Sequence, residues 1–397
     1  MPETAQERIP YSCQTIDDDD IAAVADCLRS QFLTQGPKTT QFERETADYI
    51  GAARGVVVSN GTAALHLLYQ ALGVNQNSLL WTSPISFVAS ANAARYLGAT
   101  VDFVDVDPAT GCIDPAALAT KFAKAASVGK LPNVLAAVHL AGHSFEFDRI
   151  AELCAQFGVT LVEDAAHALG AFYQDNPTRK IGAHPLSAAA TFSFHPLKSI
   201  TTGEGGMVIT NNPILADTIA QLRSHGITKS PEAMRNMRPE DGDWYYEQHA
   251  LGFNYRICDI QAALGLNQLR KLDQFMDARR SRANRYRELL ADLPLHLPHQ
   301  TDASSWHLYA VRLDRDKTNL TRKALFNQLR GQGIEAHVHY IPIHTQPYYR
   351  DLGFGPGDFP SAEDYYDTCL SLPIYPRMRD ADQDHVASCI KQAFVDA

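Results

Sequence analysis

The stretch Gly55-Val-Val-Val-Ser-Asn-Gly-Thr-Ala-Ala-Leu-His-Leu-Leu-Tyr-Gln-Ala-Leu72 joins an apolar run to an amphipathic segment through a short turn. The run Gly55–Ser59 predicts a buried strand, and Thr62–Leu72 predicts a helix. Free backbone amides at the start of such a helix, beside the Thr62 hydroxyl, suit a phosphate group. A plain turn with a helix cap is the alternative interpretation, because the pattern is neither GxGxxG nor a Walker loop.

Further short apolar runs alternate with helical patterns through the first two-thirds of the chain. The expected strands are Val101–Val106, Val134–His139, Val159–Glu163, Thr191–Phe194 and Met207–Thr210. Near-continuous apolar strands separated by amphipathic segments indicate a largely parallel sheet with helices on both faces. The sequence therefore predicts an α/β domain.

The last third of the chain has a different pattern. A long helical pattern runs from Ile257 to Leu290 and leads out of the predicted α/β domain. A strand-like piece at His307–Leu313 and an amphipathic helix near Arg322–Gln332 follow it. We expect a large α/β domain over residues 1–265 and a small α+β domain over residues 266–397.

The amino-acid composition argues against some classes of function for this protein. The 397 residues include 45 Asp and Glu against 35 Lys and Arg, a formal charge of -10. An acidic chain without a basic block argues against nucleic acid or an anionic membrane as a partner. No apolar run approaches the ~18 residues of a membrane span, and the N-terminus lacks a signal-peptide pattern. We expect a soluble cytoplasmic protein.

The candidate metal ligands do not form a convincing site. Seven cysteines are scattered without a CxxC pair, which is typical of reduced thiols. His385 and Cys389 lie one helical turn apart, but no second pair completes a tetrahedral site. The run Asp17–Asp20 precedes an amphipathic segment and predicts a helix start. We therefore expect no metal.

A second informative stretch is Leu161-Val-Glu-Asp-Ala-Ala-His-Ala-Leu-Gly170. It places the Asp164 carboxylate at the carboxyl end of a strand, where ligands bind in open α/β sheets. A carboxylate there can pair with a protonated ring nitrogen and stabilise its charge. An Asp that caps the following helix is the equally plausible alternative.

The third stretch is Thr191-Phe-Ser-Phe-His-Pro-Leu-Lys-Ser-Ile-Thr-Thr-Gly-Glu-Gly-Gly206. Lys198 stands there among apolar and hydroxyl side chains, before a glycine-rich turn. Such surroundings lower the pKa of a lysine and prepare its amine to attack a carbonyl. A surface lysine on a loop is the alternative, and the neighbouring Ser193 and His195 weigh against it.

In this order and at these separations, the three stretches resemble pyridoxal phosphate (PLP) enzymes of the aspartate-aminotransferase type. They resemble more closely the nucleotide-sugar aminotransferases of the DegT/DnrJ/EryC1/StrS family, from Ile9-Pro-Tyr-Ser12 to Tyr340-Ile-Pro-Ile-His344. Together with the stretch Arg223–Lys229, these stretches are similar to one branch of the family. That branch aminates C4 of a UDP-4-keto-6-deoxy-N-acetylhexosamine in pseudaminic acid synthesis. The resemblance implies a fold type I large domain, a homodimer, and glutamate as amino donor, which becomes 2-oxoglutarate.

The resemblance also implies roles for three catalytic residues. Lys198 would bind PLP covalently and move a proton between cofactor and sugar. Asp164 would keep the pyridine nitrogen protonated, so that the ring withdraws electrons. His167 would lie beside O3′ of the ring.

Other cofactor contacts follow from the same resemblance. Phe87 would stack on the ring face. Asn254 would reach the phosphate from the neighbouring subunit. The remaining phosphate contacts would be Gly61, Thr62, Ala63 and Ser193, and the candidate substrate contacts are Tyr11, Arg256, Tyr340 and His344.

Some alternatives stay open at this level. Asn60, Ser86 and Ser199 replace the family's more usual serine, threonine and proline. The chain could aminate another dTDP- or UDP-linked keto sugar, act as a PLP-dependent dehydratase or lyase, or serve as a non-catalytic nucleotide-sugar sensor. The presence of Lys198 favours transamination, because that reaction needs a base at this place.

Overall fold

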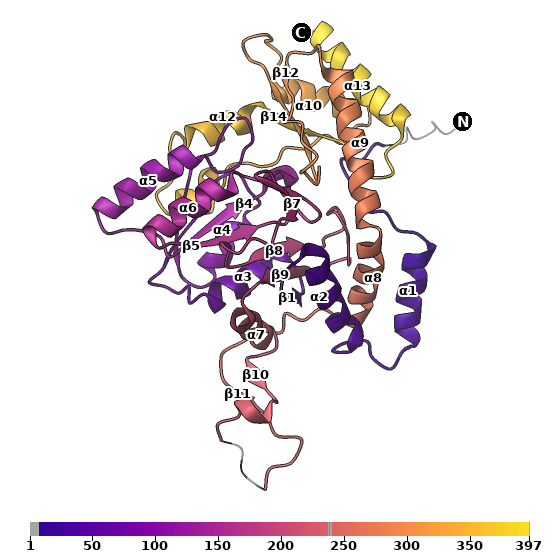
Figure 1. Cartoon of the computed structure of the whole chain (residues 1–397). Helices are drawn as coiled ribbons and strands as arrows, with labels where there is room; N and C mark the ends of the chain where they lie inside the picture. Colours follow the sequence, from indigo (N-terminus) through magenta and orange to yellow (C-terminus); the bar gives the residue numbers. More distant parts are fainter. Residues whose placement is uncertain (1–7, 237, 239, 397) are drawn as a thin grey trace.

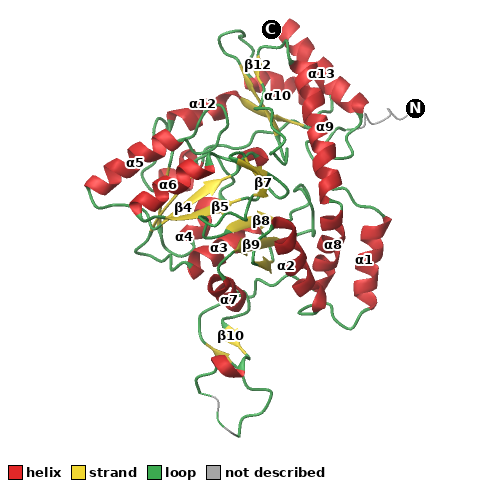
Figure 2. Ribbon diagram, viewed as in Figure 1, coloured by secondary structure: helices red, strands yellow, loops and turns green. Residues whose placement is uncertain are grey.

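The computed structural model describes residues 8–236, 238 and 240–396. A central sheet with surrounding helices forms the body, and a smaller unit stands above it (Figure 1). Helix α9 (Leu272–Leu290) runs from the body into the smaller unit. The hairpin of β10 (Ile227–Thr228) and β11 (Glu247–Gln248) projects from the opposite end, and most of its length is loop (Figure 2).

The central sheet has seven strands in the order β1-β9-β8-β5-β4-β2-β3. β9 is antiparallel to both of its neighbours, and the other six strands run in one direction. The largely parallel sheet is therefore confirmed. The strands are β1 Arg54–Val58, β2 Leu79–Thr82, β3 Thr100–Phe103, β4 Val134–Val138, β5 Thr160–Asp164, β8 Ala190–Ser193 and β9 Gly206–Thr210.

Strand β2 has no counterpart among the predicted strands. Its sequence, Leu-Leu-Trp-Thr, is too short to stand out by periodicity. It pairs with β3 on one side and β4 on the other, and its last three residues are buried. Pairing on both sides makes this short run a strand.

Helices surround the sheet and connect its strands. α3 packs against α4 and α7, and α5 packs against α6. The predicted helix after β1 is confirmed as α3. The helices of this part are α1 Asp18–Arg29, α2 Pro37–Ile50, α3 Gly61–Ala71, α4 Ala89–Arg95, α5 Pro115–Ser127, α6 Phe147–Phe157, α7 Pro213–Leu222 and α8 Asp259–Arg270.

The acidic run at the start of α1 acts as a helix cap, as predicted. Asp17 accepts a hydrogen bond from the Asp20 backbone N–H (3.1 Å), and the Asp20 side chain accepts one from the Asp17 N–H (3.1 Å). Together they form a capping box. Lys271 contacts both carboxylates and ties this helix start to the end of α8.

The long helix predicted from Ile257 to Leu290 is two helices. α8 ends at Arg270 and α9 begins at Leu272. The backbone of Lys271 lies between them with φ -101° and ψ -3°, outside the regular helical range. Periodicity could not reveal this break because the apolar pattern continues through it.

The smaller unit consists of one antiparallel sheet and the helices packed on it. Its strands are β12 Leu295–His296, β13 Tyr309–Leu313 and β14 Cys369–Leu372. A small hairpin of the body, β6 Phe172–Tyr173 with β7 Asn176–Lys180, pairs separately. The remaining helices are α9, α10 Arg322–Gly331, α11 Pro347–Arg350, α12 Pro360–Thr368 and α13 Asp380–Val395.

Two apolar cores correspond to the two units. The core of the smaller unit includes Ile9, whose backbone bonds to Gly333 and Glu335. The core of the large sheet includes Ile343, Tyr349 and other residues near the C-terminus. Both cores therefore contain residues from each side of the expected boundary at residue 265, and that boundary stays a prediction.

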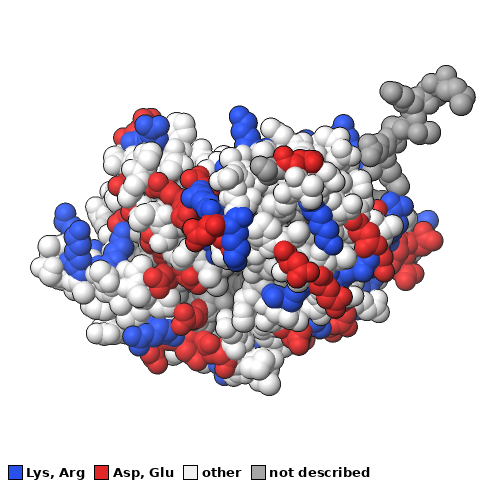
Figure 3. Space-filling model, turned by 90° about the horizontal axis from the view of Figure 1, so that it is seen from above, with Lys and Arg blue, Asp and Glu red and all other residues white. Residues whose placement is uncertain are grey.

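Charge and hydropathy of the described residues agree with the composition. On the face seen from above, acidic and basic side chains are interspersed (Figure 3). None of the described helices is long and apolar enough to span a lipid bilayer.

One buried carboxylate holds the start of α2. Asp259 is fully buried and accepts hydrogen bonds from Gly36 N (3.0 Å), Lys38 N (3.2 Å) and Thr39 Oγ1 (2.7 Å). Gly36 has no side chain to cap the helix, and a Cβ there would lie 2.3 Å from Asp259 Oδ2. Asp259, on α8, therefore supplies the cap of α2 across the fold.

We expect Asp259→Ala to lower the free energy of unfolding by about 3 kcal/mol, because it leaves three donors without their charged acceptor. Urea unfolding followed by circular dichroism measures the change. Asp26→Ala is the control, since its carboxylate pairs with Arg29 at the surface and should change stability by less than about 1 kcal/mol. Equal unfolding midpoints for the two variants would contradict the capping role.

Candidate active site

A cavity of about 710 Å³ lies where five parallel strands end. The segments after β1, β2, β4, β5 and β8 all contribute to its wall, as expected for the carboxyl edge of an α/β sheet. Of the sequence-predicted residues, the cavity brings together Tyr11, Gly61, Thr62, Phe87, Asp164, His167, Ser193, Lys198 and Tyr340.

Lys198 stands on the turn after β8, and its backbone N–H donates to the His195 carbonyl (2.9 Å). Removal from bulk water lowers the pKa of its amine to about 8, and the Asp164 carboxylate partly opposes this shift. About a tenth of the amine is therefore neutral at pH 7. The loop lysine lies inside the cavity, so the surface-lysine alternative is wrong.

Asp164 is the last residue of β5, and its side chain is buried at the cavity wall. Ser90 Oγ donates to its Oδ2 (2.6 Å), and the Ala166 backbone N–H donates to its Oδ1 (3.2 Å). Ser90 in turn bonds to Ser86 Oγ (2.8 Å). These donors hold an ionised carboxylate in a fixed position.

Ser90 is a site residue that the sequence analysis missed. It lies on α4, far along the chain from Asp164. Ser86 and Ser90 stand four residues apart on either side of Phe87, and this hydroxyl spacing was the only signal in the sequence. The spacing alone does not show that Ser90 contacts Asp164, because that contact depends on where β5 ends in the folded structure.

His167 carries a defined proton. The Ala141 backbone N–H donates to its Nδ1 (3.2 Å), so that nitrogen is an acceptor. Burial, with Lys198 and His339, lowers the pKa of His167, so the ring is neutral. The ring proton is therefore on Nε2, which lies 3.1 Å from the Tyr340 hydroxyl.

This arrangement also orients Tyr340. Since its oxygen accepts a hydrogen bond from the His167 Nε2–H, its own O–H is free to donate into the cavity. Burial, with Tyr11 and Asp164, raises the pKa of Tyr340, which keeps the hydroxyl protonated. Phe87 also lies near this ring, with ring centroids 6.2 Å apart, and is 59% exposed.

The start of α3 forms a candidate phosphate cradle. Within the described chain, the backbone N–H groups of Gly61 and Thr62 have no hydrogen-bond acceptor, whereas that of Ala63 donates to Asn60 Oδ1 (2.8 Å). A Cβ on Gly61 would come within 3.1 Å of Ser193 Cβ. Two free amides beside two hydroxyl side chains fit a phosphate group.

Four sequence-predicted residues lie outside the cavity wall. One is Ala63, whose backbone N–H is already bonded to Asn60. Asn254 is exposed, and its backbone pairs with Ser224. The Arg256 guanidinium donates to Ser224 Oγ (2.9 Å). His344 is fully buried and lies 2.9 Å from Glu363 Oε1.

The smaller unit adds a histidine-rich wall that the sequence analysis did not predict. His307 lies 4.3 Å from His167 between ring centroids. His337 and His339 stack on each other, and Tyr11 packs against both. No local motif marks these residues, since they meet only when the smaller unit packs on the sheet.

The comparisons with known proteins agree with this geometry. A sequence profile described as the DegT/DnrJ/EryC1/StrS aminotransferase family matches residues 14–391. The chain belongs to this family, and its enzyme class is aminotransferase. The expected fold type I architecture is confirmed by structures of this family.

Particular relatives cover almost the whole chain. The spore coat polysaccharide biosynthesis protein SpsC of Bacillus subtilis is 38% identical over 388 residues, 96% of each protein. The UDP-4-amino-4,6-dideoxy-N-acetyl-beta-L-altrosamine transaminase of Campylobacter jejuni is 36% identical over 382 residues, 95% of each.

Solved structures are also similar. Helicobacter pylori PseC, described as an aminotransferase of pseudoaminic acid biosynthesis, has a TM-score of 0.88 and 31% identity, covering 98% of this chain and 100% of that one. The PLP form of Spr1654 from Streptococcus pneumoniae has a TM-score of 0.85 and 26% identity, covering 98% and 99%.

We expect Lys198 to react with amine reagents at lower pH than ordinary lysines do. With a pKa of about 8, about a tenth of its amine is neutral at pH 7, and labelling should reach half its maximum near pH 8. Pulse acetylation after hydroxylamine treatment, read by peptide mass spectrometry, measures this. Asp164→Asn should shift the midpoint to lower pH, because it removes the charge that raises the Lys198 pKa. A Lys198 midpoint above pH 10 would contradict the buried environment.

Proposed function

We propose that this protein is a PLP-dependent aminotransferase that transfers an amino group from glutamate to C4 of a UDP-4-keto-6-deoxy-N-acetylhexosamine. The observation that carries the proposal is that one cavity holds Lys198, with its lowered pKa, together with Asp164 and the free amides of α3. Membership of an aminotransferase family supports the reaction class.

The residues of the cavity fit PLP in chemistry. Gly61, Thr62 and Ser193 would hold the phosphate, and Asp164 would pair with the protonated ring nitrogen. Phe87, exposed at the cavity, would cover a ring face. When bound, PLP supplies a conjugated ring that withdraws electrons from the carbon bearing the amino group.

Lys198 would move the proton at its Nζ. Its lowered pKa leaves part of the amine neutral near pH 7, so Nζ can accept a proton from carbon and return it elsewhere. Ser90 and Ala166 hold Asp164 in place, so that its charge stays fixed during the reaction. The Tyr340 hydroxyl, oriented by His167, would donate a hydrogen bond to an oxygen in the cavity.

The substrate assignment rests on the relatives. The Campylobacter jejuni protein is named a transaminase of a UDP-linked amino sugar, and PseC acts in pseudoaminic acid synthesis. A cavity of about 710 Å³ is large enough for a sugar beside the cofactor. We propose Tyr11 and Tyr340 as substrate contacts, because both line the cavity. Arg256 and His344 do not line it, so we do not propose them as direct contacts.

Amination of another dTDP- or UDP-linked keto sugar is the alternative substrate class. A PLP-dependent dehydratase or lyase on the same fold is the alternative reaction. Products distinguish them, since amination adds a nitrogen to the sugar and dehydration removes an oxygen.

We expect the purified protein, supplied with glutamate and a panel of UDP- and dTDP-4-keto sugars, to aminate the UDP-linked N-acetyl sugar fastest. Mass spectrometry of the sugar products measures this. Lys198→Ala should lose at least about a hundredfold in rate, because general acid–base transfer contributes that much. Lys180→Ala is a matched control, since burial also lowers the pKa of Lys180 but it lies outside the cavity. Wild-type rates for Lys198→Ala, or loss of oxygen without gain of nitrogen, would overturn the proposal.

We also propose a homodimer in which Asn254 reaches the phosphate of the partner's site. Asn254 is exposed and its backbone pairs with Ser224, just before β10 of the projecting hairpin, which leaves it available to a second copy. Mixing Lys198→Ala with Asn254→Asp should restore activity, because one site in each mixed dimer then receives both intact residues. Each variant alone must be dimeric and nearly inactive. Mixed dimers that form without any recovery would show that Asn254 does not serve the partner's site.

A further inference from the structure

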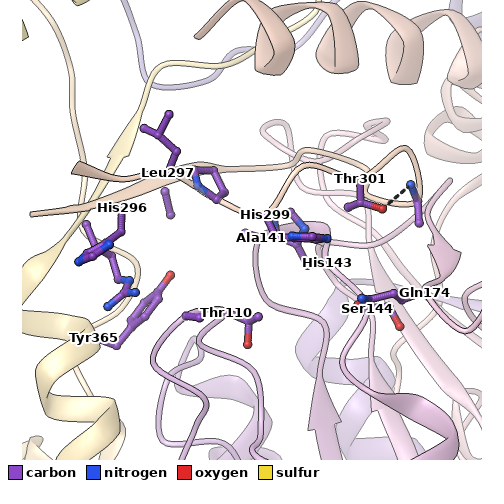
Figure 4. A pocket seen from close by; sticks show the side chains of 15 residues that line it. Thr110, Ala141, His143, Ser144, Gln174, His296, Leu297, His299, Thr301 and Tyr365 are labelled. Carbon is purple, nitrogen blue, oxygen red and sulfur yellow. Dashed lines mark hydrogen bonds between the residues drawn. The ribbon is translucent and has the colours of Figure 1, made fainter. Parts of the chain in front are cut away.

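A second cavity of about 140 Å³ lies between the large sheet and the smaller unit (Figure 4). Thr110, after β3, and Ala141, after β4, line it from the body. The segment from His296 to Thr301 and Arg312 on β13 line it from the smaller unit. Its volume corresponds to about four or five water molecules, which is room for a small ion and little more.

The polar side chains in the wall of this cavity include several hydrogen-bond donors. None of its described lining residues is acidic. His143, His299 and Gln174 offer nitrogen donors from three different segments (Figure 4). The half-buried Arg312 lines the cavity, and its guanidinium makes no hydrogen bond or ion pair with any residue that the structure describes.

Tyr365 provides a second, independent observation. Its side chain is only 3% exposed and points into the cavity (Figure 4). Its hydroxyl makes no hydrogen bond to a described residue, and it is not one of the fully buried polar atoms, which agrees with a group that faces the space of the cavity. A hydroxyl and an unpaired guanidinium that line one cavity without carboxylates fit an acceptor that carries negative charge.

The cavity adjoins the candidate active site through Ala141. Its backbone N–H is the donor that fixes the His167 proton (3.2 Å), and its carbonyl accepts from Leu308 N of the smaller unit (3.3 Å). The Ser305 hydroxyl donates to the His167 carbonyl (2.6 Å). A ligand in the cavity would therefore contact both units next to the residues that position His167.

We propose that this cavity binds a small oxyanion, such as a phosphate or a short carboxylate, and that Arg312 and Tyr365 are its principal ligands. The site is distinct from the PLP phosphate cradle, which lies at the start of α3. Bound there, the anion joins the smaller unit to the large sheet and stabilises their packing beside His167.

Titration calorimetry on the PLP-reconstituted enzyme tests the site, with inorganic phosphate and malonate as separate probes. PLP fills the cradle of α3, so that phosphate does not compete for it. We expect saturable binding in the millimolar range and a rise in Tm that saturates with it. Binding of phosphate, malonate or both supports the site and shows which oxyanion fits.

Variants separate this site from general charge effects. Arg312→Gln should weaken binding at least tenfold, and Arg312→Lys should restore part of it. Arg350→Gln, at an exposed arginine outside the cavity, removes the same charge and should leave binding unchanged.

Tyr365→Phe keeps the ring and should weaken binding severalfold. Tyr309→Phe is its matched control, because Tyr309 is also buried with an unpaired hydroxyl but does not line the cavity. No saturable binding of either probe, or equal affinity in wild type, Arg312→Gln and Tyr365→Phe, would overturn the proposal.

Discussion

The common direction of six strands is the constraint on which the rest of this structure depends. Because β1, β2, β4, β5 and β8 all end at one edge, the residues after them are delivered to one place. Gly61, Phe87, Asp164 and Lys198 come from four different segments of the chain. The single antiparallel strand of this sheet, β9, lies between β1 and β8.

The electrostatics of the site follow from burial at this edge. Lys198 and Asp164 are both withdrawn from water, but their polar surroundings differ. Hydroxyl and amide donors satisfy Asp164, whereas the lowered pKa of Lys198 reflects the loss of water around its amine. A fixed negative charge and a partly neutral amine in one cavity are the two groups that proton transfer at carbon requires.

The smaller unit completes the site. It supplies His307, His339 and Tyr340, and its Leu308 N–H bonds to the carbonyl of Ala141, the residue whose own N–H donates to His167. One backbone segment, Leu140–Gly142, contacts His167 on one side and the second cavity on the other. The position of the smaller unit therefore affects both the active-site cavity and the second cavity.

The sequence by itself determined the α/β class, most strands, the cap of α1 and the three stretches that carry Lys198, Asp164 and Gly61. These features depend on residues close together in the chain, through periodicity, capping and local polarity. The family resemblance added the site roles, which remain proposals for the individual residues.

The tertiary structure decided what depends on distant contacts. Strand β2 exists because it pairs on both sides, and the break at Lys271 leaves no mark in the apolar pattern. Ser90 reaches Asp164 from 74 residues away, and the wall of histidines forms only when the smaller unit docks. Hydrogen-bond partners and pKa shifts depend on distance and burial, which a linear pattern of residues does not contain.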